Sequence, residues 1–313
     1  PGVYRYEIAS KDGKIRALVA PRANRARRPA PSICKARNAA PSLSPNGRRR
    51  DRDRFAARVM LSAAWRVLAD EIALWRDAGR MAEFWWRDDD AALPAPALAR
   101  LLALSANTSI PLALAVVPLG ADPGLLAGFG ETVCVLQHGT DHRNRALPGE
   151  KKTEFPASEL PQAAAARLAT ARKQLQARAG DRFLPVLAPP WNRLPEALVP
   201  HLAAAGFRGI SQYGSRTSAE PSIGLRRVNT HVDIIAWRAG RGFAGEEEAL
   251  AAATRHLAAK RTGSADSREA TGWLTHHAVH DEAAWMFLER LFETTRGMPG
   301  VRWPGAQELF RIS

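Results

Sequence analysis

The chain has 313 residues, 46% of them hydrophobic, which is enough for one large α/β domain with a substantial core. No stretch approaches the roughly 20 apolar residues of a membrane helix and none resembles a signal peptide, so we expect a soluble cytoplasmic protein. The two cysteines lie in dissimilar surroundings, which argues against a disulfide framework. Cys134 lies inside an apolar run and is expected to be a small buried hydrophobe, whereas Cys34 lies in an Arg-rich stretch.

The formal net charge of +14 is concentrated at the amino-terminal end of the chain. Residues 1–54 contain 15 Lys and Arg against 4 Asp and Glu, whereas the remaining residues contain 30 against 27. The basic residues are interleaved with Pro, Ala, Ser and Asn, a composition that cannot bury enough apolar surface to become ordered. We therefore predict a disordered basic leader over 1–54 and a folded domain over 55–313. Nucleic acid could bind only through the leader, and we expect no membrane partner.

Apolar residues recur at helical spacing directly after the leader, from Leu61 to Trp75, and Gly79 ends this predicted helix. Strand-like runs then alternate with helical ones, an order typical of parallel sheets. Strands are expected near 83–87, 112–117, 132–137, 183–188, 208–212, 226–235 and 271–275, with a further short one at 301–303. Helices are expected near 94–106, 123–128, 158–179, 195–205, 246–261 and after Asp281. Seven main strands predict a single domain with a distorted or incomplete (β/α)7 barrel.

Four short polar clusters follow the ends of predicted strands. Because the carboxyl ends of parallel strands meet on one face of a barrel, these clusters should converge there, where α/β enzymes carry out their chemistry. The sequence therefore predicts an enzyme whose site contains carboxylates and imidazoles. The clusters are 87–90, 138–142, 189–192 and 276–277.

The first cluster contains three consecutive carboxylates, Asp88, Asp89 and Asp90. Neighbours in an extended segment point to opposite faces, so Asp89 and Asp90 should have different parts: one can bind a metal while the other works as a base. The alternative is a solvated acidic turn or a helix cap.

The second cluster contains His138 and His142, four residues apart. On a helical turn this spacing places both imidazoles on one face, as in pairs that bind a divalent ion. Together with one Asp they make a set of three ligands with open positions for water and substrate. The alternative is a pair of surface or hydrogen-bonded histidines.

The remaining two clusters offer a wall and an acid. Pro190 and Trp191 can form a rigid aromatic surface suited to a sugar ring, although ordinary core packing would use the same residues. His276 ends the last main strand, where it could donate a proton to a leaving group. A structural histidine is the alternative at that position.

The order of these clusters resembles the polysaccharide deacetylase family with the NodB homology domain, over roughly residues 80–280. Members are metal-dependent carbohydrate esterases that remove acetyl groups from N-acetylated sugars. The resemblance implies a hydrolase that acts on the C–N bond of a linear amide, with Asp89 as the catalytic base and His276 as the general acid. It further implies a divalent ion held by Asp90, His138 and His142. Zinc is the expected ion, and cobalt, nickel or manganese suit the same ligand types.

The family also implies a substrate groove. The Pro-Pro-aromatic motif supplies a wall and a backbone amide at Trp191 for the oxyanion. The fourth motif is approximated by an Asp and a following Trp, and the Leu-x-His motif supplies a pocket for the acetyl methyl group. The substrate-binding residues expected from this comparison and from their neighbours are Arg87, Pro190, Trp191, Asn192, Asp233, Trp237 and Leu274.

This sequence departs from the family pattern at several positions. Ala188 replaces the arginine that holds the catalytic base in the family, so Arg87 or Arg193 would have to substitute for it. The other departures are Asp88 for a Phe, Ala91 for a Gly, Gly139 for a Ser or Thr, and Ala236 for an acidic residue.

Two other functions fit parts of this pattern. A glycan-binding protein with little turnover could keep the fold and groove while lacking the orienting arginine and the acidic residue of the fourth motif. A non-haem iron oxygenase also uses two His and one carboxylate, although its scaffold should be strand-rich rather than alternating.

Overall fold

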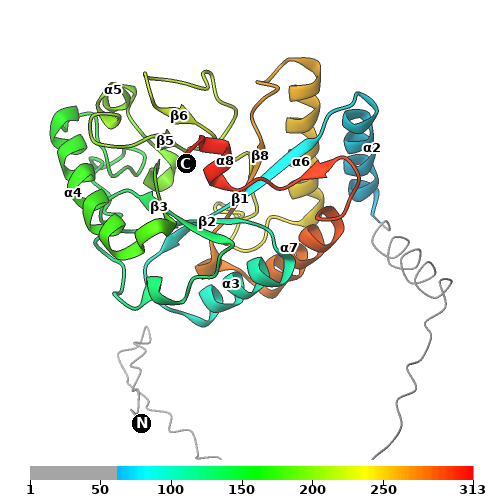
Figure 1. Ribbon diagram of the computed structural model, residues 1–313, viewed down its shortest axis with the longest axis horizontal. Helices are drawn as coiled ribbons and strands as arrows, with labels where there is room; N and C mark the ends of the chain where they lie inside the picture. The colour runs from blue at the N-terminus through cyan, green and yellow to red at the C-terminus, as the bar shows by residue number, and fades with distance from the viewer. Residues whose placement is uncertain (1–61, 313) are drawn as a thin grey trace, which may run out of the picture. The chain divides into compact units, whose positions relative to one another are not determined.

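The computed structural model describes residues 62–312 and is built on a curved sheet in which the nine named strands pair in parallel (Figure 1). The predicted leader, its boundary with the domain and Cys34 lie outside the described residues. The order of hydrogen-bonded neighbours is β6-β5-β4-β3-β2-β1-β8-β7, and β9 pairs with the start of β1. The strands are β1 (Ala82–Ala91), β2 (Leu112–Val116), β3 (Val133–His138), β4 (Phe183–Ala188), β5 (Gly209–Ile210), β6 (Arg226–Arg227), β7 (Val232–Asp233), β8 (Thr271–Thr275) and β9 (Val301–Arg302).

The two edges of the sheet are joined by one extended segment, residues 226–235, which was predicted as a single strand. Its first half runs beside β5, where the amide of Val228 donates to the carbonyl of Ile210. Its second half runs beside β8, where the amide of His231 donates to the carbonyl of Gly272. Because each half pairs for only a few residues, the barrel is distorted. The predicted distorted (β/α)7 barrel is confirmed.

Helices cover the outside of the sheet, with α2 packed along α6 and α3 beside α7 (Figure 1). Ser62 and Asp281 cap α2 and α7 with their side chains. The helix predicted at 195–205 is shorter in the structure, since Pro195 and Pro200 provide no backbone donors. The α-helices are α2 (Ala63–Asp77), α3 (Pro96–Thr108), α4 (Pro161–Ala179), α5 (Val199–Leu202), α6 (Glu246–Thr262), α7 (Glu282–Thr295) and α8 (Ala306–Phe310). The 3₁₀ turns are η1 (Leu125–Gly128), which replaces the helix predicted at 123–128, η2 (Gly180–Arg182), η3 (Pro190–Asn192), η4 (Glu196–Leu198) and η5 (His277–Val279).

The barrel interior and the helix-facing layer are lined by alternate residues of each strand. Trp85 belongs to an inner group of mostly small side chains, whereas Trp86 belongs to the larger group packed under the helices. By the same alternation, Trp85, Arg87 and Asp89 share the inner face of β1, and Asp89 is the one nearest the carboxyl end. Phe310 of α8 packs edge-on against Trp85, with ring centroids 6.1 Å apart. The sheet thus delivers Asp89 to one end of a filled barrel.

Cys134 lies within the inner group and is buried, as predicted. Burial raises the pKa of its thiol to about 12, which leaves it protonated and unreactive at neutral pH.

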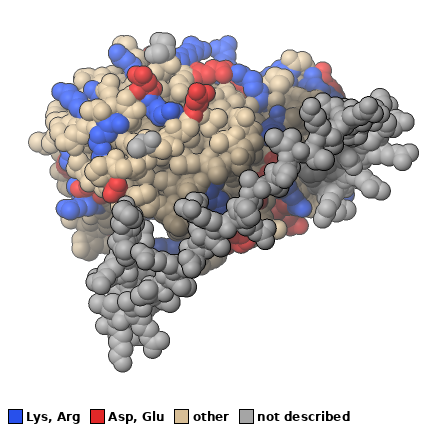
Figure 2. Space-filling model, turned by 60° about the horizontal axis from the view of Figure 1, so that its bottom comes forward, with Lys and Arg blue, Asp and Glu red and all other residues tan. Residues whose placement is uncertain are grey.

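Charged side chains of both signs lie on the surface of the described part. Figure 2 shows Lys and Arg together with Asp and Glu on one face, as expected from the nearly balanced charge of residues 55–313. Among the helices of residues 62–312, none is both long and apolar enough to cross a membrane.

Two histidines are buried together between α6 and the β7–β8 region. The rings of His231 and His256 stack with centroids 3.5 Å apart, and Nε2 of His231 lies 3.3 Å from a carboxylate oxygen of Glu269. The amide of Gly272 donates to Nδ1 of His231, and Nδ1 of His256 is 2.9 Å from the hydroxyl of Thr271. Burial, together with the charges of His231 and Lys260, lowers the pKa of His256 to about 2. Burial also lowers the pKa of His231 despite the nearby Glu269.

These lowered pKa values predict that the fold loses stability in mild acid. A folded-state pKa below the unfolded value of 6.5 means that the unfolded chain binds more protons below pH 6.5. The contribution of His256 is therefore complete above pH 6.5 and is lost at up to about 1.4 kcal/mol per pH unit below it. We expect His256→Gln to flatten the unfolding free energy between pH 6.5 and 5 by about 1 kcal/mol per pH unit relative to wild type, as measured by urea denaturation. Parallel curves for the two proteins would contradict this prediction.

Candidate active site

Three of the predicted site residues meet at the carboxyl end of the barrel. Asp90 comes from β1, His138 ends β3, and His142 lies in the loop that follows β3. Oδ1 of Asp90 lies 3.0 Å from Nε2 of His138 and 3.1 Å from Nε2 of His142. The two imidazoles stack with centroids 5.1 Å apart. Residues far apart in the sequence thus face one common point.

The backbone around these residues is irregular, which differs from the prediction. The Asp cluster lies inside β1 rather than after it, and a register shift against β2 occurs between Asp88 and Ala91. His138 and His142 are not on a helical turn: His138 ends β3, and His142 lies in the loop after it with φ 54°. Asp90 also has a positive φ, 69°. Such conformations are strained for residues other than Gly and are concentrated at functional sites.

The donor set fits a divalent metal ion. The ligand atoms of Asp90, His138 and His142 all lie within 4.8 Å of one another, close enough to share one ion. Burial acts to raise the pKa of Asp90, but the two imidazoles outweigh it and hold that pKa well below its usual range. The carboxylate is therefore ionised, as a ligand must be, and two imidazoles with one carboxylate suit zinc and other first-row metals.

Asp89 is held by Arg87 from the same strand. Nη2 of Arg87 donates to Oδ2 of Asp89 at 2.9 Å, and Nε lies 2.9 Å from Oδ1. Nη1 of Arg87 donates to the carbonyl and hydroxyl oxygens of Ser211, and Nη2 also donates to Oδ1 of Asn192 at 2.6 Å. Arg87 is fully buried, so it does not face the groove as we had predicted for a substrate-binding residue. Instead, Arg87 contacts the candidate base Asp89, the role that the family gives to the arginine replaced here by Ala188.

Asp88 faces the opposite side of β1 and supports the turn after β8. Its carboxylate accepts hydrogen bonds from the Thr275 hydroxyl at 2.6 Å and from the His277 amide at 3.0 Å, and it lies 2.5 Å from Nδ1 of His277. Burial acts to raise the pKa of Asp88, but the nearby His277 lowers it overall, so a charged pair is buried here. Asp88, which stands where the family pattern has a Phe, therefore positions the segment that carries His276.

His276 lies at the rim of the same site and is nearly buried. The ring of Trp237 packs edge-on against it, with centroids 4.7 Å apart, and the indole N–H of Trp237 donates to Asp233 at 2.8 Å. Burial raises the pKa of Asp233 above its usual value. Of the two residues assigned to the fourth motif, Trp237 contacts His276 directly, and Asp233 holds the Trp237 ring.

A cavity of about 780 Å³ opens over these residues. Trp191 forms part of its wall and packs against His142, with ring centroids 4.5 Å apart. Pro190 and Leu274 are buried and do not line this cavity, unlike the other predicted groove residues apart from Arg87. The lining residues are Asp89, Asp90, His138, His142, Lys152, Trp191, Asn192, Arg193, Tyr213, Asp233, Trp237, Arg238, Arg241 and His276.

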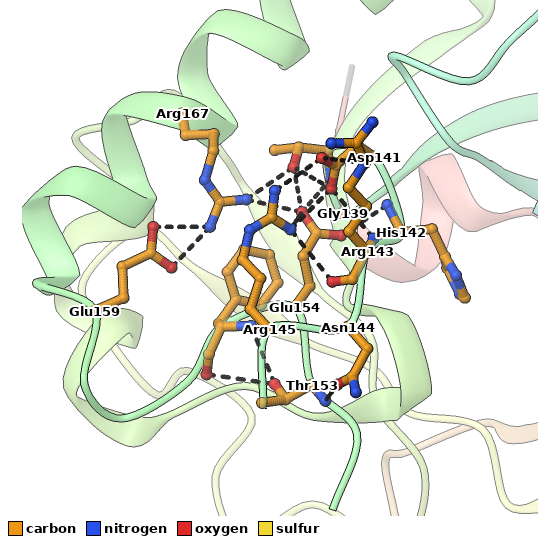
Figure 3. Close-up of polar contacts among 12 residues, drawn as sticks. Gly139, Asp141, His142, Arg143, Asn144, Arg145, Thr153, Glu154, Glu159 and Arg167 are labelled. Carbon is orange, nitrogen blue, oxygen red and sulfur yellow. Dashed lines mark hydrogen bonds and ion pairs between the residues drawn. The ribbon is translucent and has the colours of Figure 1, made fainter. Parts of the chain in front are cut away.

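The loop that carries His142 is held by Glu154, which sequence reasoning missed (Figure 3). One carboxylate oxygen of Glu154 accepts from the amide of Thr140 at 2.8 Å, and the other accepts from the amide of His142 at 3.2 Å. Arg167 of α4 donates to Glu154 at 2.9 Å and also binds Glu159. Glu154 is fully buried, so this charged network fixes the direction in which His142 leaves the loop.

Gly139 is required by the same loop. It has φ 63°, and a Cβ atom there would collide with the Glu154 carboxylate and the Pro190 ring. This explains why Gly stands where the family pattern has Ser or Thr.

The stacked His231 and His256, with Glu269, form a second group of metal-ligand type within the described residues. The nitrogens of these rings already have partners: the Gly272 amide at Nδ1 of His231, the Thr271 hydroxyl at Nδ1 of His256, and Glu269 at Nε2 of His231. The neighbouring charge of Lys260 also opposes a cation there. This group is therefore a structural cluster.

No protein-family model matches the sequence, and no curated protein does. Solved structures do match. A T48 deacetylase with substrate has 14% identity and a TM-score of 0.43, over 75% of this chain and 92% of that chain. A family 4 carbohydrate esterase from Streptomyces lividans in complex with acetate has 16% identity and a TM-score of 0.44, over 71% and 90%. A family 4 acetyl xylan esterase from Clostridium thermocellum in complex with a cobalt ion has 15% identity and a TM-score of 0.44, over 74% and 91%.

This chain is similar to these carbohydrate esterases and deacetylases.

Proposed function

We propose that the protein is a metal-dependent hydrolase that removes acetyl groups from an acetylated carbohydrate, with an N-acetylated sugar as the expected substrate. The observation that supports this most is the convergence of Asp90, His138 and His142 beside Asp89 in an open cavity. The family resemblance of these motifs supplies the acetyl specificity.

When bound by these three residues, a divalent ion supplies Lewis acidity, which polarises an acetyl carbonyl and acidifies water. Asp89, oriented by Arg87, accepts the proton of the attacking water. The backbone amide of Trp191 serves as a hydrogen-bond donor for the developing oxyanion. His276 donates a proton to the departing amine.

The alternatives from the sequence have less support. The glycan-binding interpretation rested on two missing residues, the arginine beside the base and the acid of the fourth motif. Arg87 contacts Asp89 directly and supplies the first, whereas Ala236 leaves the second unfilled. An iron oxygenase was expected on a strand-rich scaffold, whereas strands and helices alternate here around a parallel barrel.

Elemental analysis combined with an acetate-release assay tests the proposal. The purified protein should contain a divalent metal and release acetate from at least one of chitin oligosaccharides, peptidoglycan or small acetylated sugars. A chelator should abolish release, and added zinc should restore it. Oxygen consumption that requires ferrous iron and a keto-acid, without acetate release, would refute the proposal in favour of the oxygenase.

A further inference from the structure

The cavity over the candidate metal ligands has four basic residues in its lining: Lys152, Arg193, Arg238 and Arg241. All four are exposed. Among the described residues, no carboxylate oxygen lies within 4.0 Å of a side-chain nitrogen of any of the four, so none of them forms an ion pair. By contrast, Arg87 beside the same cavity is paired with Asp89. Four cations without acidic partners give this part of the cavity a positive potential, which attracts an anionic ligand.

The acidic residues of the cavity do not provide that compensation. Asp89 is neutralised by Arg87, and Asp90 lies between the two imidazoles. Asp233 accepts hydrogen bonds from the indole N–H of Trp237 and the amide of Ile235 and forms no ion pair with any of the four basic residues. The outer part of the cavity is therefore positive, while its floor holds the catalytic candidates.

The four cations come from two separate places in the fold. The side chain of Arg193, in the segment after β4, donates to the carbonyl of Lys152, which joins two loops next to Trp191 and His142. Arg238 and Arg241 lie on a turn after β7 that follows Trp237. The turn is closed by a backbone hydrogen bond: the amide of Ala236 donates to the carbonyl of Gly242 at 2.9 Å.

The backbone of the turn after β7 is held in one conformation, which fixes where its arginines begin. Arg241 has φ 61°, a conformation that non-Gly residues adopt at a cost, and the amide of Phe243 donates to Asp281 at 3.0 Å. A guanidinium can donate to the hydroxyls of a neutral glycan, but its hydrogen bonds to a carboxylate or a phosphate are charge-assisted and about twice as strong.

We propose that the substrate is an anionic glycan, whose acid groups are bound by these four residues next to the acetylated sugar. This inference rests on the proposed function for the acetyl group, but the preference for an acidic glycan concerns binding and can be measured without hydrolysis.

The test compares glycans that differ in charge alone. Hyaluronan hexasaccharide, which carries carboxylates and N-acetyl groups, is compared with its neutral methyl ester, and a poly(N-acetylglucosamine 1-phosphate) oligomer distinguishes phosphate from carboxylate. Calorimetry measures binding to the metal-loaded protein, and acetate release is followed in parallel. We expect at least one acidic probe to bind about tenfold or more tightly than the methyl ester, and less tightly as salt is raised.

Two variants locate the effect. Arg238→Gln/Arg241→Asn uses Asn at the positive φ, and Lys152→Gln/Arg193→Gln removes the other pair; each should reduce the preference for the acidic probe about tenfold. Arg66→Gln/Arg268→Gln, with the same loss of charge at exposed positions outside the cavity, should leave it unchanged. Thermal unfolding shows whether each variant folds. If one of the two cavity variants does not fold, the comparison uses the other one.

The outcomes separate the two proposals. Preferential binding of an acidic probe that the cavity variants abolish, with no acetate released from any compound, would support the anionic ligand and contradict the deacetylase. Acetate release without a preference for acidic glycans would support the deacetylase and overturn this inference. Equal or absent binding of the acidic and neutral probes would overturn it as well.

Discussion

Substituting Asn for Asp90 should abolish metal uptake and reduce acetate release by about 1,000-fold or more, since several kcal/mol of transition-state stabilisation depend on the ion. Asn is the most informative replacement because it tolerates the positive φ of Asp90. The substitution therefore removes the charge without new backbone strain. His138→Gln should have the same effect, because the Nε2 of His138 is one of the atoms 3.0 Å from Asp90. Elemental analysis and the acetate assay measure both results.

The matched controls are Asp181→Asn and His201→Gln, which change the same residue types away from the cavity. Both should keep one ion per chain and wild-type turnover. Thermal unfolding of the apoproteins separates a lost ligand from a lost fold. Wild-type metal content or activity in Asp90→Asn would exclude this residue as a ligand.

Much of the fold could be predicted because the pattern of the strands is local. The runs at 183–188 and 271–275 were predicted to the residue, since each ends at a sharp change of sequence, the first at Pro189 and the second at His276. The split of 226–235 into two short pairings could not be predicted. It depends on where β5 and β8 end, which is a property of the assembled barrel.

The candidate site was predictable where its residues lie at strand ends, because parallel topology brings those ends together. Trp85, Arg87 and Asp89 follow the alternation of a strand, which puts the guanidinium on the same face as Asp89. We had offered Arg87 or Arg193 for this role and had also assigned Arg87 to the groove. Glu154 had no such signal. It lies 14 residues from Thr140, in a loop without periodicity, and only the folded chain brings its carboxylate to the amide of His142.

Replacing Arg87 is expected to have the second largest effect, on both activity and stability. Arg87→Met leaves the Asp89 carboxylate buried without its partner, which should cost about 3–5 kcal/mol of unfolding free energy. Arg87→Lys keeps the charge but cannot contact both carboxylate oxygens, so Asp89 should be misplaced and kcat should fall about 100-fold with little change in KM. Denaturant unfolding and steady-state acetate release measure the two effects.

A double-mutant cycle distinguishes a positioning role from general damage to the core. If Arg87 acts by holding Asp89, Arg87→Met/Asp89→Leu should recover part of the stability lost in Arg87→Met, because no unpaired charge remains in the barrel. Arg255→Met, which breaks an exposed pair with Glu248, should cost at most about 1 kcal/mol and leave kcat unchanged. Full activity in Arg87→Lys would show that Asp89 does not need contacts to both of its oxygens. In that case the hydrogen bond from Nη2 to Asn192 and the contacts to Ser211 would be the reason why an arginine is buried at this position.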